Sequence, residues 1–111
     1  MDVYCSDEFT VWFQELEEAH KDSVGVAVLK LEARGIDLGY PVSSAIQNCK
    51  YAFRELRIKS HGHALRVIYA FDPARDAYLI LGGDKTGVKQ RQFYDQLISR
   101  CEQIWAEYLS A

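Results

Sequence analysis

Two apolar segments joined by a short polar turn constrain the fold of this chain more than any other feature. Residues 65–71 read LRVIYAF and residues 77–83 read AYLILGG, and both are rich in residues that favour strands. The connecting sequence DPARD places Pro73 where the first central residue of a turn is expected. A connection this short joins antiparallel neighbours, so the sequence predicts a β-hairpin.

A third strand is predicted directly before this hairpin. Residues 50–58, KYAFRELRI, again combine aromatic and aliphatic side chains, and a turn around Gly62 connects them to residue 65. The three strands then form an antiparallel meander. Upstream, glycine, proline and serine residues between Gly35 and Asn48 predict an irregular connection.

Helical spacing of apolar residues organises the remainder of the chain. Residues 2–6 predict a short strand, and Ser6 and Asp7 form a plausible N-cap for the helix that follows. A second apolar stripe, from Val24 to Leu31, predicts a helix that Gly35 terminates. The last helix has the clearest stripe, which consists of Phe93, Leu97, Ile98, Cys101, Ile104, Trp105, Tyr108 and Leu109. The order strand, helix, helix, three strands, helix predicts one α+β domain over residues 1–111, with the C-terminal helix packed on the sheet.

Composition limits the classes of function. A net charge of −3 with 49% hydrophobic and 26% charged residues is typical of a folded globular protein and excludes a chain whose whole surface binds nucleic acid. No apolar run reaches membrane-spanning length and no signal peptide is recognisable, so a cytoplasmic protein is expected. Cys5, Cys49 and Cys101 lack metal-ligand spacing and are expected to be buried free thiols.

Basic side chains gather on the predicted strands and their edges. Leu65, Val67, Tyr69 and Phe71 alternate with Arg66, so Arg66 is predicted on the sheet face opposite to theirs. Arg57 lies opposite Leu56 by the same argument. Two arginines on one sheet face suit phosphate recognition, because guanidinium groups bind phosphate oxygens in pairs. The alternative is a solvated ion pair between Arg57 and Glu55 or another carboxylate.

The run GGDKTG at residues 82–87 does not fit a P-loop, because an aspartate and not a glycine precedes Lys85. It is interpreted as a strand end that presents Lys85 at the sheet edge. His61 and His63 lie in a turn without further ligands at metal-binding spacing, so exposed turn histidines are expected and no metal site. Tyr94 is either a rim residue of the last helix or a polar group directed into a cleft.

Several stretches together resemble the RelE/ParE superfamily of bacterial toxins, and most closely its HigB-type, phage-derived branch. They are FRELR (53–57), LRVIYAFDPARDAYLILGGDKTG (65–87), FY (93–94) and IWAEYL (104–109). The resemblance implies a RelE-like fold, which agrees with the predicted order of elements. It also implies the toxin of a type II toxin–antitoxin system, a ribosome-dependent endoribonuclease that cleaves messenger RNA by attack of a 2′-hydroxyl, without a metal or cofactor.

The resemblance further assigns residues and partners. Arg66 and Arg57 would stabilise the charged phosphate, Lys85 would bind the phosphate or backbone, and Tyr94 would orient the 2′-hydroxyl or stack on a base. The residues expected to contact RNA phosphates around them are Arg54, Lys59, His61, His63, Lys89 and Arg91. The implied partners are the ribosome with its messenger RNA and a cognate antitoxin with a helix-turn-helix domain, which can form a hetero-oligomer with the toxin.

The chain departs from the pattern at the general base. Related enzymes carry a lysine pair on the strand before the hairpin, and this chain has Phe53 and Glu55 there. The base therefore stays open among Arg54, Lys59, His61 and His63. Two alternatives accompany the ribonuclease hypothesis: a non-catalytic gyrase inhibitor of the ParE type, and a degenerate toxin retained as an antitoxin-binding module.

Overall fold

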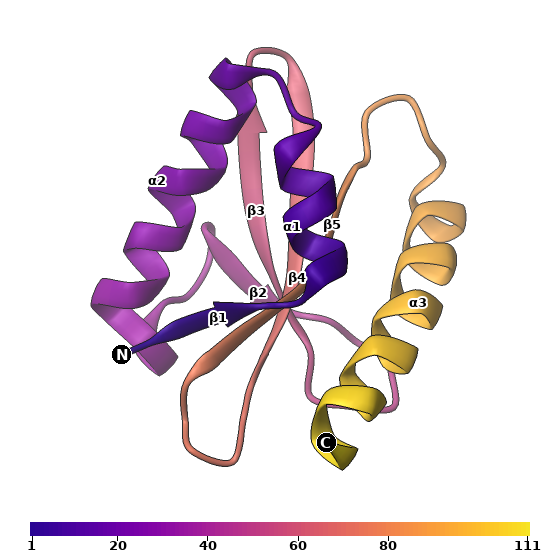
Figure 1. Ribbon diagram of the computed structural model, residues 1–111. Helices are drawn as coiled ribbons and strands as arrows, with labels where there is room; N and C mark the ends of the chain where they lie inside the picture. Colours follow the sequence, from indigo (N-terminus) through magenta and orange to yellow (C-terminus); the bar gives the residue numbers. More distant parts are fainter.

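The computed structural model describes residues 1–111 as a five-stranded sheet with helices on both faces (Figure 1). Helices α1 and α2 form a hairpin over one face, and α3 lies on the other. The elements in chain order are β1 (Val3–Cys5), α1 (Asp7–Gln14), α2 (Glu18–Arg34), a 3-10 turn (Gly35–Asp37), β2 (Ser43–Ala45), β3 (Arg54–Ser60), β4 (His63–Phe71), β5 (Ala77–Asp84) and α3 (Gln90–Ser110). The predicted α+β order is confirmed, and no helix has the length and apolar character that a membrane crossing requires.

The sheet is mixed, with strand order β1-β5-β4-β3-β2. The predicted meander forms its centre, because β3 pairs with β4 and β4 pairs with β5, both antiparallel. β1 adds to the outer side of β5 in parallel, and β2 adds to β3 in antiparallel orientation. In the central register Arg57 lies directly opposite Arg66, and Arg66 lies opposite Gly83.

Two predictions about the region before the hairpin were wrong. The third strand begins at Arg54 and not at Lys50, because the chain turns at Tyr51, whose carbonyl accepts the Phe53 amide at 2.8 Å. The connection predicted as irregular contains β2, a three-residue strand. Its serine-rich sequence carries no apolar alternation, and its place in the sheet comes from pairing with β3.

The three cysteines are free thiols as expected, but only Cys101 is buried as expected. Cys101 is buried in the α3 core, which raises the pKa of its thiol to about 12. Cys5 is exposed because it ends the edge strand β1, and Cys49 is half-buried.

The sheet is buried on both faces. Helices α1 and α2 cover Leu56, Leu65, Val67 and Tyr69 on one face, as the alternation in the sequence predicted. The opposite face packs Ile68, Ala70 and Ile80 against α3. Arg66 shares the α3 face, so it stands on a face that is apolar and covered rather than open to solvent.

Local signals in the sequence place the helix ends. The Ser6 hydroxyl accepts the Phe9 amide at 2.9 Å and donates to the Ile80 carbonyl at 2.5 Å, so the predicted N-cap also ties α1 to β5. The predicted end of α2 at Gly35 is confirmed, since this residue has φ +56°, a conformation that glycine adopts readily.

Gly82 in β5 is required by the close approach of α1. A Cβ atom at this position would lie 2.3–2.5 Å from three atoms of the Trp12 ring. We therefore expect Gly82→Ala to lower the free energy of unfolding by about 1–3 kcal/mol in urea denaturation. Gly25→Ala is the control, because its Cβ meets nothing within 4 Å and should raise stability by about 0.4–1 kcal/mol. Equal free energies of unfolding for the two variants would show that the Trp12 ring does not pack tightly on Gly82.

Candidate functional site

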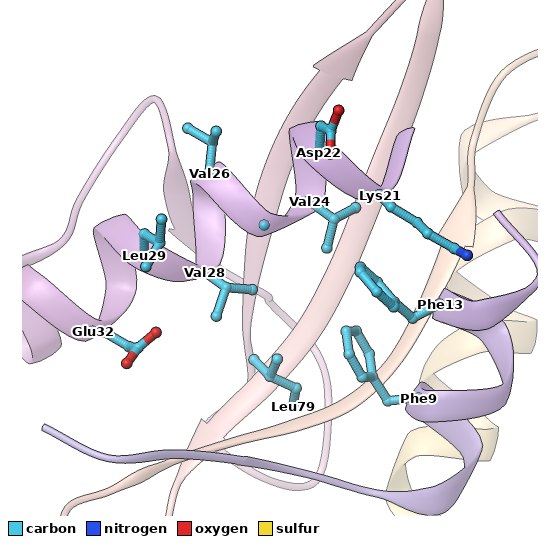
Figure 2. A pocket seen from close by; sticks show the side chains of 11 residues that line it. Phe9, Phe13, Lys21, Asp22, Val24, Val26, Val28, Leu29, Glu32 and Leu79 are labelled. Carbon is cyan, nitrogen blue, oxygen red and sulfur yellow. The ribbon is translucent and has the colours of Figure 1, made fainter. Parts of the chain in front are cut away.

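Two hollows on the surface differ in chemical character. One lies between α1 and α2 and is mostly apolar (Figure 2). The other, of about 1050 Å³, lies between the first half of β3, the segment 45–48, the β5–α3 connection and the first half of α3. This polar cleft is lined by Glu55, Arg57, Lys85, Arg91, Tyr94, Asp95 and Glu102, among others. Only the polar cleft collects side chains able to bind a charged substrate and move protons.

Glu55 connects the groups of the polar cleft. Its carboxylate accepts a hydrogen bond from the Tyr94 hydroxyl at 2.5 Å and one from the Ser44 hydroxyl at 3.2 Å. It forms ion pairs with Arg66 at 3.5 Å and with Arg57 at 3.8 Å. The alternative ion pair between Arg57 and Glu55 is therefore present, but it is not a solvated one, because Glu55 is 6% exposed.

Arg66 holds its guanidinium group inside the protein. The residue is 5% exposed, and one terminal nitrogen donates to the Leu65 carbonyl at 3.0 Å. Its Nε lies in the ion pair with Glu55 but has no hydrogen-bond partner. A buried donor without a partner is unusual in a folded protein, and a catalytic role is one explanation for it.

Arg57 is the more accessible of the two arginines. It lies directly across from Arg66 on the same sheet face, and its guanidinium carbon is 5.6 Å from the centre of the Tyr40 ring. The two cations share one carboxylate, so Glu55 neutralises only part of their charge. The polar cleft thus keeps a net positive charge at its inner end.

Lys85 lies at the edge of the sheet, as predicted. Its amide donates to the Ala64 carbonyl at 2.8 Å, which extends the β4–β5 pairing by one residue. Its ammonium is 6.0 Å from the centre of the Tyr94 ring. Burial, together with the charges of Arg66 and Arg57, lowers the pKa of Lys85 below its ordinary value of 10.5.

Tyr94 lines the polar cleft, and its hydroxyl bonds to Glu55 there. Of the two predicted positions, it therefore takes that of a polar group directed into a cleft and not that of a rim residue of α3. Burial, followed by the hydrogen bond to Glu55, raises the pKa of Tyr94, so its hydroxyl keeps its proton at neutral pH. The first turn of α3 can approach the sheet because β5 carries Gly83 here. A Cβ at Gly83 would lie 3.0 Å from the ring of Phe93.

Arg54 lies on the other side of the sheet. Its Nε donates to the Ser43 hydroxyl at 3.2 Å and to the Tyr69 hydroxyl at 3.4 Å, both on the face that α1 and α2 cover. This arginine therefore does not join Arg57 and Arg66 in the polar cleft.

The three histidines gather beside α2, away from the polar cleft. The His20 ring centre is 4.8 Å from that of His63 and 6.1 Å from that of His61. His63 Nδ1 lies 2.5 Å from a carboxylate oxygen of Asp84, and the His20 ring bonds to Ser60 at 2.7 Å. No group of three histidine, cysteine or acidic side chains is placed to hold a metal ion.

The remaining predicted phosphate contacts are peripheral. Arg91 lines the outer part of the polar cleft but is exposed and paired with Asp95 at 3.8 Å. Lys89 precedes α3 and is exposed outside the polar cleft. Lys59 is exposed at the end of β3 and lines a different hollow beside α2.

Glu55 is the residue that the sequence reasoning missed. The sequence pattern shows Glu55 only where related enzymes have a lysine and as a possible ion-pair partner of Arg57. The alternation of β3 carried the necessary signal, because Glu55 and Arg57 are two residues apart and therefore share a face.

Comparison with known proteins identifies the family to which the chain belongs. Residues 11–106 match the family described as phage derived protein Gp49-like. Two proteins of Mycobacterium tuberculosis are similar over most of the chain. "Putative toxin HigB2" is 31% identical over 106 residues and "Putative toxin HigB3" is 37% identical over 101 residues. The first alignment covers 94% of this chain and 52% of the relative, so the chain spans about half the length of that relative. The second alignment covers 90% of this chain and 86% of the relative. The chain belongs to the phage-derived Gp49-like family and is related to HigB-type toxins.

Proposed function

We propose that this protein is the toxin of a toxin–antitoxin system and that it acts as an endoribonuclease on messenger RNA in the ribosome. The observation that carries the proposal is that Glu55, Arg57, Lys85 and Tyr94 line one polar cleft, with the buried Arg66 paired to Glu55 behind them. The similarity to proteins named as HigB toxins supports the toxin part of the proposal. A binding module alone has no need for a buried, partly unpaired arginine.

The cations bind the scissile phosphate. Arg57 and Lys85 offer donors from the lining of the polar cleft, and Arg66 adds positive charge from the buried side, next to Glu55. Negative charge on the phosphate oxygens increases when a fifth oxygen attacks phosphorus. Donors fixed before the reaction stabilise that charge without having to reorganise.

The Glu55 carboxylate takes the proton of the attacking 2′-hydroxyl, with Tyr94 orienting both groups through its hydrogen bond. The bond from the 2′-oxygen to phosphorus forms as the bond from phosphorus to the 5′-oxygen breaks. The Lys85 ammonium, whose pKa is lowered, gives a proton to the leaving 5′-oxygen. The products are a 2′,3′-cyclic phosphate and a 5′-hydroxyl, and Glu55 and Lys85 regain their starting states by proton exchange with water.

The distribution of charge along the chain fits an RNA substrate despite the overall charge of −3. Residues 1–38 contain nine acidic residues and three lysines or arginines, whereas residues 39–111 contain seven acidic and ten basic residues. The acidic excess lies in α1, α2 and their flanks, and the polar cleft belongs to the basic part. The cleft side can therefore approach ribosomal and messenger RNA.

Purified protein should be incubated with ribosomes carrying a defined messenger RNA in the decoding site, and with the same RNA alone. We expect cleavage within the ribosome-bound codon and much slower cleavage of the free RNA. Intact RNA in both reactions, with a correctly folded protein, would contradict the proposed activity.

A further inference from the structure

Two small hollows lie beside the polar cleft, at the edge of the sheet next to α2. One, of about 270 Å³, lies between α2 and the second half of β3, and the other, of about 290 Å³, lies between the end of α2 and residues 38–42. The two hollows share Lys30 and Val42, and Arg57 lines both the first hollow and the polar cleft. The hollows therefore continue from the polar cleft through Arg57.

The short strand β2 leaves this edge of β3 open. It pairs only with residues 54–56, so from Arg57 onward β3 has no strand on its outer side. The Arg57 amide instead donates to the Val42 carbonyl at 2.8 Å, which holds residues 40–42 beside it. Arg57 thus stands where a bound chain can pass from the polar cleft over the edge of the sheet toward α2.

The two hollows are lined by cations and by no acidic side chain. The cations, which we call the basic surface, are Lys30, Arg34, Arg57 and Lys59. Lys30, Arg34 and Lys59 are exposed and form no ion pair within the chain. Uncompensated cations that adjoin a cleft suited to a phosphate are the pattern expected for binding a longer polyanion.

Tyr40 presents an aromatic ring at the same place. At 77% exposed, it is the most exposed of the large apolar and aromatic side chains. The Ser43 amide donates to the Gly39 carbonyl at 3.1 Å and closes the turn that carries Tyr40. The guanidinium carbon of Arg57 lies 5.6 Å from the centre of the ring. An exposed ring held on a closed turn beside an arginine is a surface on which a nucleobase can stack.

From these observations we infer that the basic surface and Tyr40 form a subsite for single-stranded RNA outside the polar cleft. Phosphates of the chain contact Lys30, Arg34 and Lys59, one base stacks on Tyr40, and Arg57 connects this subsite to the polar cleft. Stacking does not read the edges of a base, so the subsite holds the chain without selecting its sequence. That the bound RNA is the substrate rests on the ribonuclease function proposed above; the chemistry of the subsite does not.

Binding of an RNA that cannot be cleaved tests the subsite apart from catalysis. The probe is a fluorescent single strand of about ten nucleotides with a methyl group on every 2′-oxygen, so that no 2′-hydroxyl can attack. Its binding to the purified protein is measured by fluorescence anisotropy at several salt concentrations. We expect saturable binding that weakens as salt increases, because the phosphates release counterions when cations bind.

The salt dependence reports the cations. Combining Lys30→Ala, Arg34→Ala and Lys59→Ala should reduce the slope of log affinity against log salt by about 2, since each phosphate contact on a single strand contributes about 0.7. Lys21→Ala is the matched control, because Lys21 lies on the same helix but is paired with Glu18 at 3.3 Å outside the basic surface. It should keep the wild-type slope.

Tyr40→Ala should weaken binding by at least about fivefold through the loss of one stacked base. Tyr40→Phe keeps the ring and should bind like the wild type. Tyr4→Ala, at an exposed tyrosine on the opposite edge strand β1, should also bind like the wild type. A strand of the same length without bases should bind equally to the wild type and to Tyr40→Ala. Thermal unfolding checks that all variants are folded.

The proposal is overturned if the methylated RNA does not bind, if the triple variant keeps the wild-type slope, or if Tyr40→Ala binds as Tyr4→Ala does. An oligoglutamate peptide that binds as tightly as the RNA would assign the cations to an acidic protein segment instead. Failure of the proposed ribonuclease is a separate result, since it would appear as intact RNA on ribosomes while the methylated RNA still binds through Tyr40. In that case the basic surface would remain the RNA-binding site of a protein with another activity.

Discussion

Arg66→Ala is expected to reduce cleavage of ribosome-bound messenger RNA by at least about 100-fold and to abolish growth inhibition. The Arg66 guanidinium is buried beside Glu55, and its Nε is the one buried side-chain nitrogen or oxygen without a hydrogen-bond partner. The measurement is the single-turnover cleavage rate on programmed ribosomes. Arg66→Lys, which keeps the charge beside Glu55 but loses the planar group of donors, should also lose most of the activity.

Arg54→Ala is the matched control for this prediction. Arg54 and Arg66 are both strand arginines, but Arg54 bonds to Ser43 and Tyr69 on the opposite face of the sheet. Its removal should lower stability without changing the cleavage rate of the folded protein. Equal activity of Arg66→Ala and Arg54→Ala, both folded, would contradict the role of Arg66.

Glu55→Gln is expected to reduce the cleavage rate by about 100- to 10,000-fold, the usual contribution of a general base. Glutamine keeps the shape of the side chain and can still accept the hydrogen bonds of Ser44 and Tyr94. It cannot take a proton from the 2′-hydroxyl. The loss should therefore lie in the chemical step, with ribosome binding retained.

The pH profile tests Lys85 as the proton donor. The wild-type rate should fall at alkaline pH, where the Lys85 ammonium loses its proton. Because burial and the neighbouring arginines lower the pKa of Lys85, this decrease should begin below the ordinary lysine value of 10.5. A rate that does not decrease until above that value would exclude Lys85 as the donor.

Local sequence patterns predicted the frame of the site. The alternation in residues 65–71 placed Arg66 on the face opposite to Leu65 and Val67, and the structure confirms that face. The predicted turn between β4 and β5 is also confirmed. The Arg75 amide donates to the Asp72 carbonyl at 2.8 Å and closes a turn in which Pro73 is the first central residue. Patterns of this kind need only the geometry of one strand or one turn.

The inner part of the site depended on contacts between distant segments. Tyr94 of α3 lies 39 residues from Glu55 and contacts it only because Gly83 lets the helix approach the sheet. β2 likewise exists through its pairing with β3 and not through its own sequence. Arg54 was predicted to contact RNA phosphates because of its residue type, and this prediction did not use its position in the strand. The alternation of β3 places Arg54 on the face opposite to that of Glu55 and Arg57, where it bonds to Ser43.

Mapping of messenger RNA ends after induced expression in a bacterium tests whether the protein cleaves codons in the ribosome. We expect new cleavages in phase with codons, upstream fragments that end in a 2′,3′-cyclic phosphate, and absence of both with Arg66→Ala and with Glu55→Gln. Growth arrest without new codon-phased ends, or the same ends from the Arg66→Ala protein, would contradict this expectation.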